Sequence, residues 1–404
     1  MLHTVRWIAF ALAVLLLIIS PYLPTGVPGL LVIIAALSIW FKTAEKWLSI
    51  ALGLIGLLGM VGILPVFVLY AAILIVATKE FVFSLTGGKT IEYALSFICA
   101  LLVTAFVMEY LGVQSWLSAV VGATVCVLLH SILGSQKNAT AIELVVVALV
   151  MLLIEDLEYE AAFPLVGTAV VIAFGFSYFA YRLKTADIPG LFSAALVGVL
   201  LIVFAGISWF LIMLSFFILG AVATRYQMDY KKALHVEEEK GGVRGYINVF
   251  ANGLVSVCAA IGFGVTQHPV FIAAYLGSVA TAAADTVAGE IGVCSGKPLL
   301  ITTFEPVPEG TNGGVSFLGE VAGLFGAIFV SACAVLLGVA DFSIFVAAMI
   351  GGFIGTNLDS LLGELYENKH LWGNAGTNFL ATLGGAIITV ILWAIVSFFT
   401  GFTG

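Results

Sequence analysis

Two acidic signatures of the same form occur in this sequence, in AADTVAGEIG (283–292) and TNLDSLLGEL (356–365), with their aspartates 74 residues apart. Each contains Asp-x-x-x-Gly-Glu, and together they supply four carboxylates: Asp285, Glu290, Asp359 and Glu364. Mg²⁺ prefers oxygen ligands and in proteins usually takes one or two carboxylates beside phosphate oxygens and water. We therefore predict that these four residues are catalytic and hold a metal bound to a phosphate compound.

The spacing within each signature sets a condition on the backbone. Five residues along an ideal helix rotate the side chain by about 140°, which would not aim Asp285 and Glu290 at one ion. A glycine, Gly289 or Gly363, precedes each glutamate, and glycine suits the place where a helix ends or unwinds. We expect a break at each glycine to turn the glutamate toward its aspartate.

Two glycine-containing segments, EPVPEGTNGGVS (305–316) and GNAGTN (373–378), each follow one acidic signature and precede a predicted helix. Successive glycines let backbone amides approach an anion closely, and a helix N-terminus favours negative charge. Neither segment is a P-loop, because GxxxxGK[ST] is absent. We predict substrate or nucleotide contacts from Thr311, Asn312, Gly313, Gly314, Asn374 and Asn378.

Five of the fifteen Lys and Arg residues lie between positions 225 and 244. Lys240 and Arg244 flank glycines, and we predict that they neutralise phosphate oxygens, Lys as a point charge and Arg by forked hydrogen bonds. Lys231 and Lys232 are explained by the preference for basic residues in cytoplasmic loops. Asn252, one turn after Asn248, either caps a helix or reaches into the same site.

The rest of the chain nearly excludes charge. Of 404 residues, 62% are hydrophobic and 9% charged, and the mean hydropathy is +1.19, which excludes a water-soluble globule. Apolar runs near twenty residues without strict alternation predict helices, not a barrel, so the fold class is all-α, a polytopic integral membrane protein. A carboxylate at membrane depth then marks a site. The five cysteines and five histidines are dispersed and predict no metal site.

We predict about fifteen transmembrane helices, with a re-entrant pair around Pro65 as the alternative for the third and fourth. The run to Ser20 is interpreted as an anchor, not a cleaved signal, because Pro21 and further spans follow. The predicted spans are 5–20, 27–41, 47–62, 64–78, 91–112, 115–134, 140–155, 161–181, 188–205, 207–224, 247–266, 270–288, 315–340, 343–362 and 375–399.

Basic residues indicate the orientation of these spans. With the N-terminus in the cytoplasm, all fifteen Lys and Arg fall in or next to cytoplasmic segments, and the C-terminus lies outside. Both acidic signatures then reach the cytoplasm, where nucleoside triphosphates and magnesium are found. The same side holds a polar cluster of the N-terminal half, Thr78 to Glu80 with Lys89 and Glu92, which we interpret as an interfacial anchor without an assigned role.

The motifs resemble a known family from about Asp187 to the end of the chain. They are similar to the membrane proteins that include the plant chloroplast phytyl-phosphate kinase and animal transmembrane protein 19, and more faintly to dolichol and phytol kinases, whose donor is CTP. We accordingly divide the chain into an N-terminal transmembrane module of unassigned role, 1–185, and a catalytic transmembrane domain, 186–404. The matching segments, in family order, are KGGVRGYINVFANG (240–253), ADTVAGEIG (284–292), LLITTFEPVPEGTNGGVSFLG (299–319), NLDSLLGELY (357–366) and GNAGTNF (373–379).

The resemblance implies an integral membrane kinase whose active site faces the cytoplasm. The γ-phosphoryl of a nucleoside triphosphate, with CTP favoured, would pass to a phytyl or geranylgeranyl monophosphate and give the diphosphate. Mg²⁺, the nucleotide, the isoprenoid phosphate and membrane lipid are the expected partners, and we expect no nucleic acid. Such transfers depend on positioning and charge neutralisation, so no strong base is needed. Glu320 departs from the family pattern, in which a neutral residue is expected.

Other functions are consistent with parts of the pattern. A secondary transporter would use intramembrane acids as proton or ion sites. A prenol kinase would phosphorylate the free alcohol. A prenyl transferase would also bind a diphosphate through paired aspartates, but the DDxxD spacing is absent. Depth distinguishes the first alternative, because acids at the bilayer midplane favour transport and acids in a cytoplasmic bowl favour the kinase.

Overall fold

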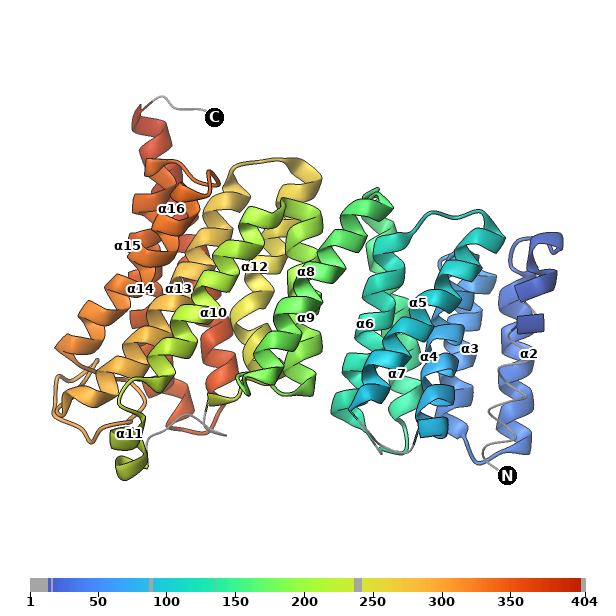
Figure 1. The fold of residues 1–404 in the computed structure, drawn as a ribbon, viewed down its shortest axis with the longest axis horizontal. Helices are drawn as coiled ribbons and strands as arrows, with labels where there is room; N and C mark the ends of the chain where they lie inside the picture. The colour runs from blue at the N-terminus through green and yellow to red at the C-terminus, as the bar shows by residue number, and fades with distance from the viewer. Residues whose placement is uncertain (1–13, 16, 87–89, 135, 236–241, 401–404) are drawn as a thin grey trace. The chain divides into compact units, whose positions relative to one another are not determined.

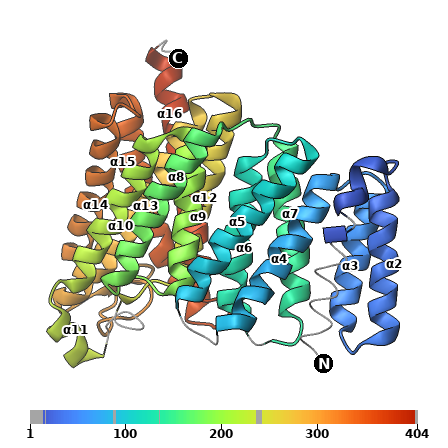
Figure 2. The ribbon, with the colours of Figure 1, turned by 45° about the vertical axis from the view of Figure 1, so that its right-hand side comes forward.

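The computed structural model describes the chain except for residues 1–13, 16, 87–89, 135, 236–241 and 401–404. It contains two compact units, Met1–Val171 and Ile172–Gly404, which Figures 1 and 2 show as two groups of helices. We call them unit 1 and unit 2. The division falls within a helix, α8 (Phe163–Arg182), whereas the predicted domain boundary at residue 185 follows that helix.

Unit 1 consists of helices with short connections. After a 3₁₀ turn, η1 (Ser20–Tyr22), the described helices are α2 (Val27–Lys42), α3 (Lys46–Met60), α4 (Val66–Thr86), α5 (Ile91–Leu111), α6 (Trp116–Leu133) and α7 (Ala139–Asp156). Most of the predicted first span lies outside the described residues. The fourth span was predicted to end at residue 78, but α4 continues because the charged Lys79 and Glu80 that follow have partners inside the unit.

Unit 2 begins within α8 and contains the acidic signatures. Its further helices are α9 (Ile188–Ala205), α10 (Ile207–Arg225), α11 (Met228–Leu234), α12 (Tyr246–Thr266), α13 (Val270–Gly292), α14 (Phe317–Leu336), α15 (Phe342–Leu362) and α16 (Asn374–Thr400). A 3₁₀ turn, η3 (Val293–Ser295), and a two-stranded ladder, β1 (Leu299–Leu300) with β2 (Gly314–Val315), connect α13 to α14. A π-helical turn, η4 (Gly363–Glu367), follows α15.

The all-α membrane fold agrees with the prediction. Among the described residues, eleven helices are long and apolar enough to cross a membrane, and α2 and α3 are shorter apolar helices. Helix α7 holds Glu143, Glu155 and Asp156 and is not among the eleven. The predicted count of about fifteen therefore exceeds the count that length and composition support in the described part of the chain. The helices themselves begin and end near most of the predicted limits.

Small residues let α13 pack closely against its neighbours in unit 2. Ala280, Ala283 and Ala284 are fully buried. A Cβ atom added at Gly352 of α15 would lie 2.7 Å from Ala280 Cβ, and one added at Gly326 of α14 would lie 2.8 Å from the Ala283 carbonyl oxygen. Such glycine contacts allow helix backbones to approach closely in membranes. This packing places the ends of α13 and α15, with both signatures, side by side (Figure 1).

Candidate active site

A cavity of about 530 Å³ lies within unit 2, next to the paired ends of α13 and α15. One part of its wall is polar and comes from α12, α13, α15, α16 and the segment 310–316. Another part is apolar and comes from α8, α9 and α10, where Phe176, Val197, Phe210, Met213 and Phe216 line it. The cavity therefore has room for a ligand with both a charged and an apolar portion.

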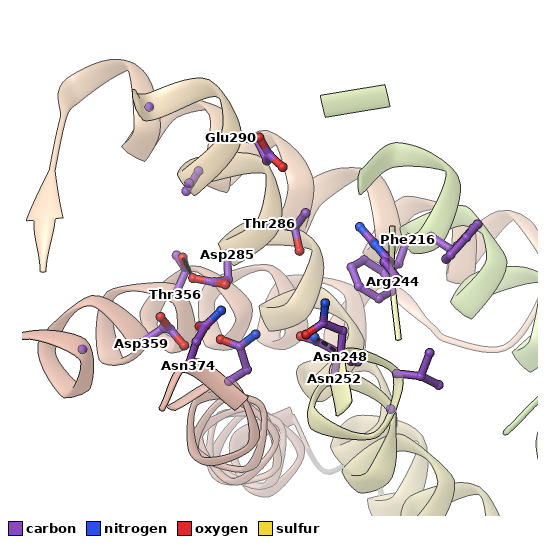
Figure 3. A pocket seen from close by; sticks show the side chains of 18 of the residues that line it. Phe216, Arg244, Asn248, Asn252, Asp285, Thr286, Glu290, Thr356, Asp359 and Asn374 are labelled. Atoms are coloured by element: carbon purple, nitrogen blue, oxygen red, sulfur yellow. Dashed lines mark hydrogen bonds between the residues drawn. The ribbon is translucent and has the colours of Figure 1, made fainter. Parts of the chain in front are cut away.

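Asp285 and Asp359 form an acid pair at the polar part of this cavity (Figure 3). Their carboxyl groups lie within hydrogen-bonding reach of each other. Thr356 Oγ1 donates to Asp285 Oδ1 at 3.4 Å. With its amide nitrogen turned toward Asp359, Asn378 donates to Asp359 Oδ2 at 3.1 Å and to Asn374 Oδ1 at 2.9 Å. The structure thus brings the two signature aspartates and both α16 asparagines together.

The third acid that lines this part of the cavity is Glu367, not Glu364. Glu367 lines the cavity and interacts electrostatically with both aspartates. In a straight α-helix Glu367 would be rotated about 80° from Asp359, eight residues earlier. The wider π turn over Gly363–Glu367 returns it toward the face of Asp359, and such turns occur frequently at functional sites. The sequence analysis missed this residue because its motif ended at Glu364.

Glu364 lies away from the acid pair. Its Oε1 accepts a hydrogen bond from Thr302 Oγ1, and its Oε2 is buried with no hydrogen-bond partner in the described part of the protein. A Cβ atom on Gly313, which has φ of +83°, would lie 2.5 Å from Glu364 Cβ. Gly313 therefore permits the loop 310–316 to pack against the π turn. The break expected at Gly363 does occur, but the glutamate of this turn that lines the cavity is Glu367.

Glu290 lines the cavity but is already paired with a lysine. Lys231 Nζ of α11 lies 2.5 Å from Glu290 Oε2 and also donates to the carbonyls of Ala223 and Thr224 at the end of α10. The Glu290 Oε1 atom is buried with no hydrogen-bond partner among the described residues. The helix break expected at Gly289 does not occur, because α13 continues to Gly292. Lys231 is also only 1% exposed, so this residue of a predicted cytoplasmic loop has partners inside unit 2 that the sequence analysis did not predict.

Arg244 reaches the cavity from the segment before α12. The Arg244 amide donates to the Thr185 carbonyl at 3.0 Å, and its own carbonyl accepts from the Asp187 amide at 3.3 Å, so the backbone there is fixed. The guanidinium carbon lies 5.4 Å and 5.1 Å from the ring centroids of Phe216 and Phe217. Such cation–π contacts hold a guanidinium at an apolar wall while its N–H groups remain directed at polar partners.

The other predicted contact residues are distributed around the same cavity. Asn252 and Asn248 both line it, and the side-chain Nδ2 of Asn252 donates to the backbone carbonyl of Asn248 at 3.0 Å. The whole segment Thr311–Gly314 lines it as well. Lys240 lies outside the described residues. Glu320, the departure from the family pattern, also lines the cavity and accepts from Asn357 Nδ2 at 3.1 Å.

The charges around the cavity are unbalanced. Its described lining contains one basic side chain, Arg244, and five carboxylates: Asp285, Glu290, Glu320, Asp359 and Glu367. Even with Glu290 neutralised by Lys231, the carboxylates exceed the positive charge, and two of them face each other directly. Buried charges require compensation, and oxygen-rich sites with this composition suit Mg²⁺. The paired carboxylates of Asp285 and Asp359 therefore fit a divalent cation in their chemistry, and Glu367 lines the same cavity.

These features define a polytopic helical membrane protein with an acidic, partly apolar cavity at its helix ends. Residues 171–386 match the family model described as integral membrane protein DUF92, and the chain belongs to that family. The matched region coincides with unit 2, which contains the cavity. This family assignment agrees with the resemblance that the motifs of the C-terminal half indicate.

Relatives from three organisms each match between 50% and 59% of the chain. An uncharacterized membrane protein of Methanocaldococcus jannaschii is 36% identical over 211 residues, which are 52% of this chain and 87% of the relative. An uncharacterized membrane protein of Synechocystis is 33% identical over 247 residues, which are 59% of this chain and 95% of the relative. Protein VTE6, chloroplastic, of Arabidopsis thaliana is 29% identical over 212 residues, which are 50% of this chain and 64% of the relative. No solved structure matches this chain.

Proposed function

We propose that unit 2 is a membrane kinase that transfers the γ-phosphoryl group of a nucleoside triphosphate to an isoprenoid monophosphate. The observation that supports this best is the cavity itself, which combines a pair of aspartates and a further lining carboxylate, Glu367, with an apolar wall of three helices. A prenyl phosphate has the same two-part character. The family resemblance implies phytyl or geranylgeranyl chains and favours CTP as donor, and basic residues at these helix ends favour a cytoplasmic site.

In this proposal the acid pair and Glu367 form the donor side of the site. They would hold a Mg²⁺ ion, which would offset the charge of the nucleotide phosphates. Asn378 positions the Asp359 carboxylate through its amide, and Thr356 positions Asp285 through its hydroxyl. Polar partners of this kind fix ligand orientation, which strongly affects metal affinity. The sequence motif predicts Glu290 and Glu364 as further ligands, whereas the pairing of Glu290 with Lys231 and the place of Glu367 in the cavity lining favour Glu367 in this proposal.

Arg244 and the apolar wall form the acceptor side. The prenyl chain would lie against Val197, Phe210 and Met213, and its phosphate would meet the guanidinium of Arg244. Because Arg244 lies over Phe216 and Phe217, it stands where the charged head of such a substrate would join its apolar tail. A forked guanidinium suits phosphate oxygens and reduces repulsion between the two reacting phosphates.

The reaction is a direct transfer between phosphates. An oxygen of the acceptor monophosphate forms a bond to the γ-phosphorus as the bond from that phosphorus to the β–γ bridging oxygen breaks. The nucleoside diphosphate leaves with the electron pair, and the product is the prenyl diphosphate. Since a phosphate monoester is largely ionised at neutral pH, the acceptor needs no strong base. The protein's contribution is positioning and charge compensation.

The depth of the acids favours this proposal over transport. Asp359 is three residues and Asp285 seven residues from the ends of their helices. At about 1.5 Å per residue, Asp359 lies roughly 5 Å and Asp285 roughly 10 Å from the end of its α-helix, and both lie in the half of the spans Val270–Ser295 and Phe342–Glu367 that ends beside the cavity. A transporter that alternates access would place its ion site near the midplane.

The test uses purified full-length protein with geranylgeranyl or phytyl monophosphate, Mg²⁺ and each of the four nucleoside triphosphates in turn. We expect diphosphate formation that is lost in Asp285→Asn and Asp359→Asn. Absence of diphosphate with every donor would refute the kinase. Phytol and geranylgeraniol serve as parallel acceptors, and their phosphorylation in place of the monophosphates would instead identify a prenol kinase.

A further inference from the structure

Gly220 lies inside a membrane helix, and the sequence analysis assigned it no role. It is buried five residues before the end of α10, and its carbonyl accepts from Thr224 Oγ1 at 3.0 Å. A glycine in a helix interior costs about 0.5–1 kcal/mol relative to alanine. Close packing of two helices ordinarily offsets that cost in membranes. The atoms around Gly220 show which neighbour occupies the space that a side chain would fill.

That neighbour is the guanidinium of Arg244. Among the described residues outside α10, a Cβ atom added at Gly220 would come nearest to Arg244 Nη2, with which it would collide, and would lie 3.3 Å from Arg244 Cζ. The adjoining helix α13 contributes Thr286 Cγ2 at 3.2 Å, a methyl group that a small shift would accommodate. By contrast, an atom added at Gly326 of α14 would first meet the backbone of Ala283. Gly326 thus permits helix packing, whereas Gly220 leaves space for an arginine, and we call this space the Gly220 recess.

The backbone of Arg244 is fixed independently of the Gly220 recess. Its amide and carbonyl are bonded to Thr185 and Asp187. The carbonyl also packs against the first turn of α9, where a Cβ atom added at Gly190 would collide with it. That turn is held by the Asp187 side chain, whose Oδ1 accepts from the Gly190 amide at 2.8 Å. The near end of the Arg244 side chain therefore has a set position, and the surface of α10 determines where its charged end lies.

Three residues of α10 form the surface that receives the guanidinium. Phe216 and Phe217 precede Gly220 by four and three residues, so both are its neighbours on the helix surface. The Arg244 guanidinium carbon is 5.4 Å and 5.1 Å from the two ring centroids. The rings hold the planar group by cation–π attraction, and the missing side chain at Gly220 lets its edge come close to the helix backbone. A methyl group at Gly220 would push the guanidinium away from this surface.

The Gly220 recess ends beside the residue that follows Asp285. Thr286 and Asp285 are consecutive in α13, and both line the cavity together with Arg244. An atom added at Gly220 would contact Thr286 as well as Arg244, so α10 and α13 approach each other where the guanidinium lies. Figure 3 shows Thr286 between Asp285 and Arg244. The position of the guanidinium on α10 therefore sets its position relative to the acid pair.

On the basis of the acceptor role proposed for Arg244, we propose that Gly220 is a positioning residue, whose recess holds the guanidinium where an acceptor phosphate bound to it lies next to the acid pair. Gly220 has no side chain to touch a substrate, so it acts only through Arg244. Forked hydrogen bonds to a phosphate depend on the place and the tilt of the guanidinium. Transfer between two phosphates depends in turn on the alignment of the reacting atoms. A residue larger than glycine would keep the positive charge in the cavity but disturb this alignment.

The first test replaces Gly220 by alanine in the full-length protein in lipid nanodiscs. Isothermal titration calorimetry with geranyl monophosphate, without nucleotide, measures acceptor binding, and diphosphate formation gives the KM of acceptor and nucleotide. In Gly220→Ala we expect the dissociation constant and the acceptor KM to rise about tenfold, because a displaced guanidinium loses a charged hydrogen bond to the phosphate. The nucleotide KM should change by less than about twofold, because the acid pair is intact. Gly175→Ala in α8, where an added Cβ atom meets no described atom within 4 Å, is the matched control and should change neither.

A second variant separates the collision with Arg244 from a general effect on helix packing. Arg244→Lys replaces the planar guanidinium by a single ammonium group, which has no Nη2 atom. In this background Gly220→Ala should weaken monophosphate binding by less than about twofold further, because the colliding group is absent. Size-exclusion profiles and thermal unfolding establish that each variant is folded. If Gly220→Ala alone fails to fold, folding of the double variant supports the collision, and failure of both overturns the proposal.

Two further results would overturn the proposal: unchanged monophosphate binding in Gly220→Ala, or an equal loss of binding from Gly220→Ala in the Arg244→Lys background and in the original protein. The proposed function fails differently. An original protein that binds geranyl monophosphate and forms no diphosphate with any nucleotide would refute the kinase, while weaker binding in Gly220→Ala would still support the role of Gly220. An original protein that binds no monophosphate would overturn both.

Discussion

The two units of this protein bury carboxylates in different ways. In unit 1, Glu80 and Glu143 contact an ammonium group from the chain itself, Lys79. In unit 2, Asp285 and Asp359 lie against each other beside a cavity of about 530 Å³, with another acid, Glu367, nearby. Acids neutralised by the chain form a closed network, whereas acids beside open volume that have no counter-ion among the described residues support the proposal that a cation binds there.

Unit 2 contains both arrangements within one cavity. Glu290 is paired with Lys231 at 2.5 Å, although it belongs to the same signature as Asp285. Membership of a motif therefore does not decide which acids bind a ligand. The decisive property is whether the chain provides each carboxylate with its own cation.

The largest effect is expected at the acid pair. Asp285→Asn or Asp359→Asn should reduce diphosphate formation by about a thousandfold or more, because phosphoryl transfer depends on charge compensation at the transferring group. The measurement is chromatography of labelled prenyl diphosphate. Asp341→Asn, which alters a capping residue at the far end of α15, is a matched control and should retain most of the activity. Equal activity of Asp285→Asn, Asp359→Asn and Asp341→Asn would contradict the conclusion that the acid pair of unit 2 acts on a ligand, unlike the neutralised acids of unit 1.

The comparison also predicts opposite effects on stability. Lys79→Met should lower the free energy of unfolding by about 3 kcal/mol, since it leaves buried carboxylates without their partner. Asp285→Asn should leave that free energy unchanged or raise it by about 1 kcal/mol, because it relieves repulsion at a site built for function. Denaturant titration of the full-length protein in detergent measures both. A loss of stability in Asp285→Asn as large as that in Lys79→Met would contradict this reasoning.

A narrower test compares the two glutamates of the π turn. Glu367→Gln should weaken Mn²⁺ binding about tenfold, whereas Glu364→Gln should change it by less than about twofold. Electron paramagnetic resonance of Mn²⁺ reports free and bound metal without requiring activity. The reverse order of effects would restore the ligand set that the sequence motif predicts.

The smallest expected effect concerns the apolar wall. Ala194 lines the cavity on α9, and Ala194→Phe should fill space that the prenyl chain would occupy. We expect activity with geranylgeranyl monophosphate to fall about fivefold while activity with the ten-carbon geranyl monophosphate changes little, in line with the modest discrimination of apolar pockets. Ile218→Phe, on an exposed part of α10, is the control. An equal loss of activity with both monophosphates would indicate that the prenyl chain does not lie against Ala194.

The sequence predicted the helices well because apolar runs of membrane length are a strong signal. The clearest error in a helix boundary was at α4, which was expected to stop before Lys79 and Glu80. A single sequence shows two charges after an apolar run. It does not show that Glu143, more than sixty residues later, neutralises Lys79 inside the bundle.

The candidate site was predictable only in part. The repeated motif identified Asp285 and Asp359, and the structure places them together. Glu367 was missed because no sequence pattern predicts a π turn, and the π turn determines which glutamate lines the cavity. The pairing of Lys231 was not predicted, because a buried lysine and a solvated one look the same in a sequence and only the contacts with Ala223, Thr224 and Glu290 distinguish them.

The close packing of α13 against the glycines of α15 and α16 also affects the geometry of the acid pair. Thr281, one turn before Asp285, fits into a notch between Gly355 of α15 and Gly385 of α16, where any larger residue would collide with it. Gly355 is itself one turn before Asp359. The separation of the two carboxylates therefore depends on close packing one helical turn before them. A single carbon atom added at Gly355 or Gly385 would collide with Thr281 and push the two aspartate-bearing helices apart.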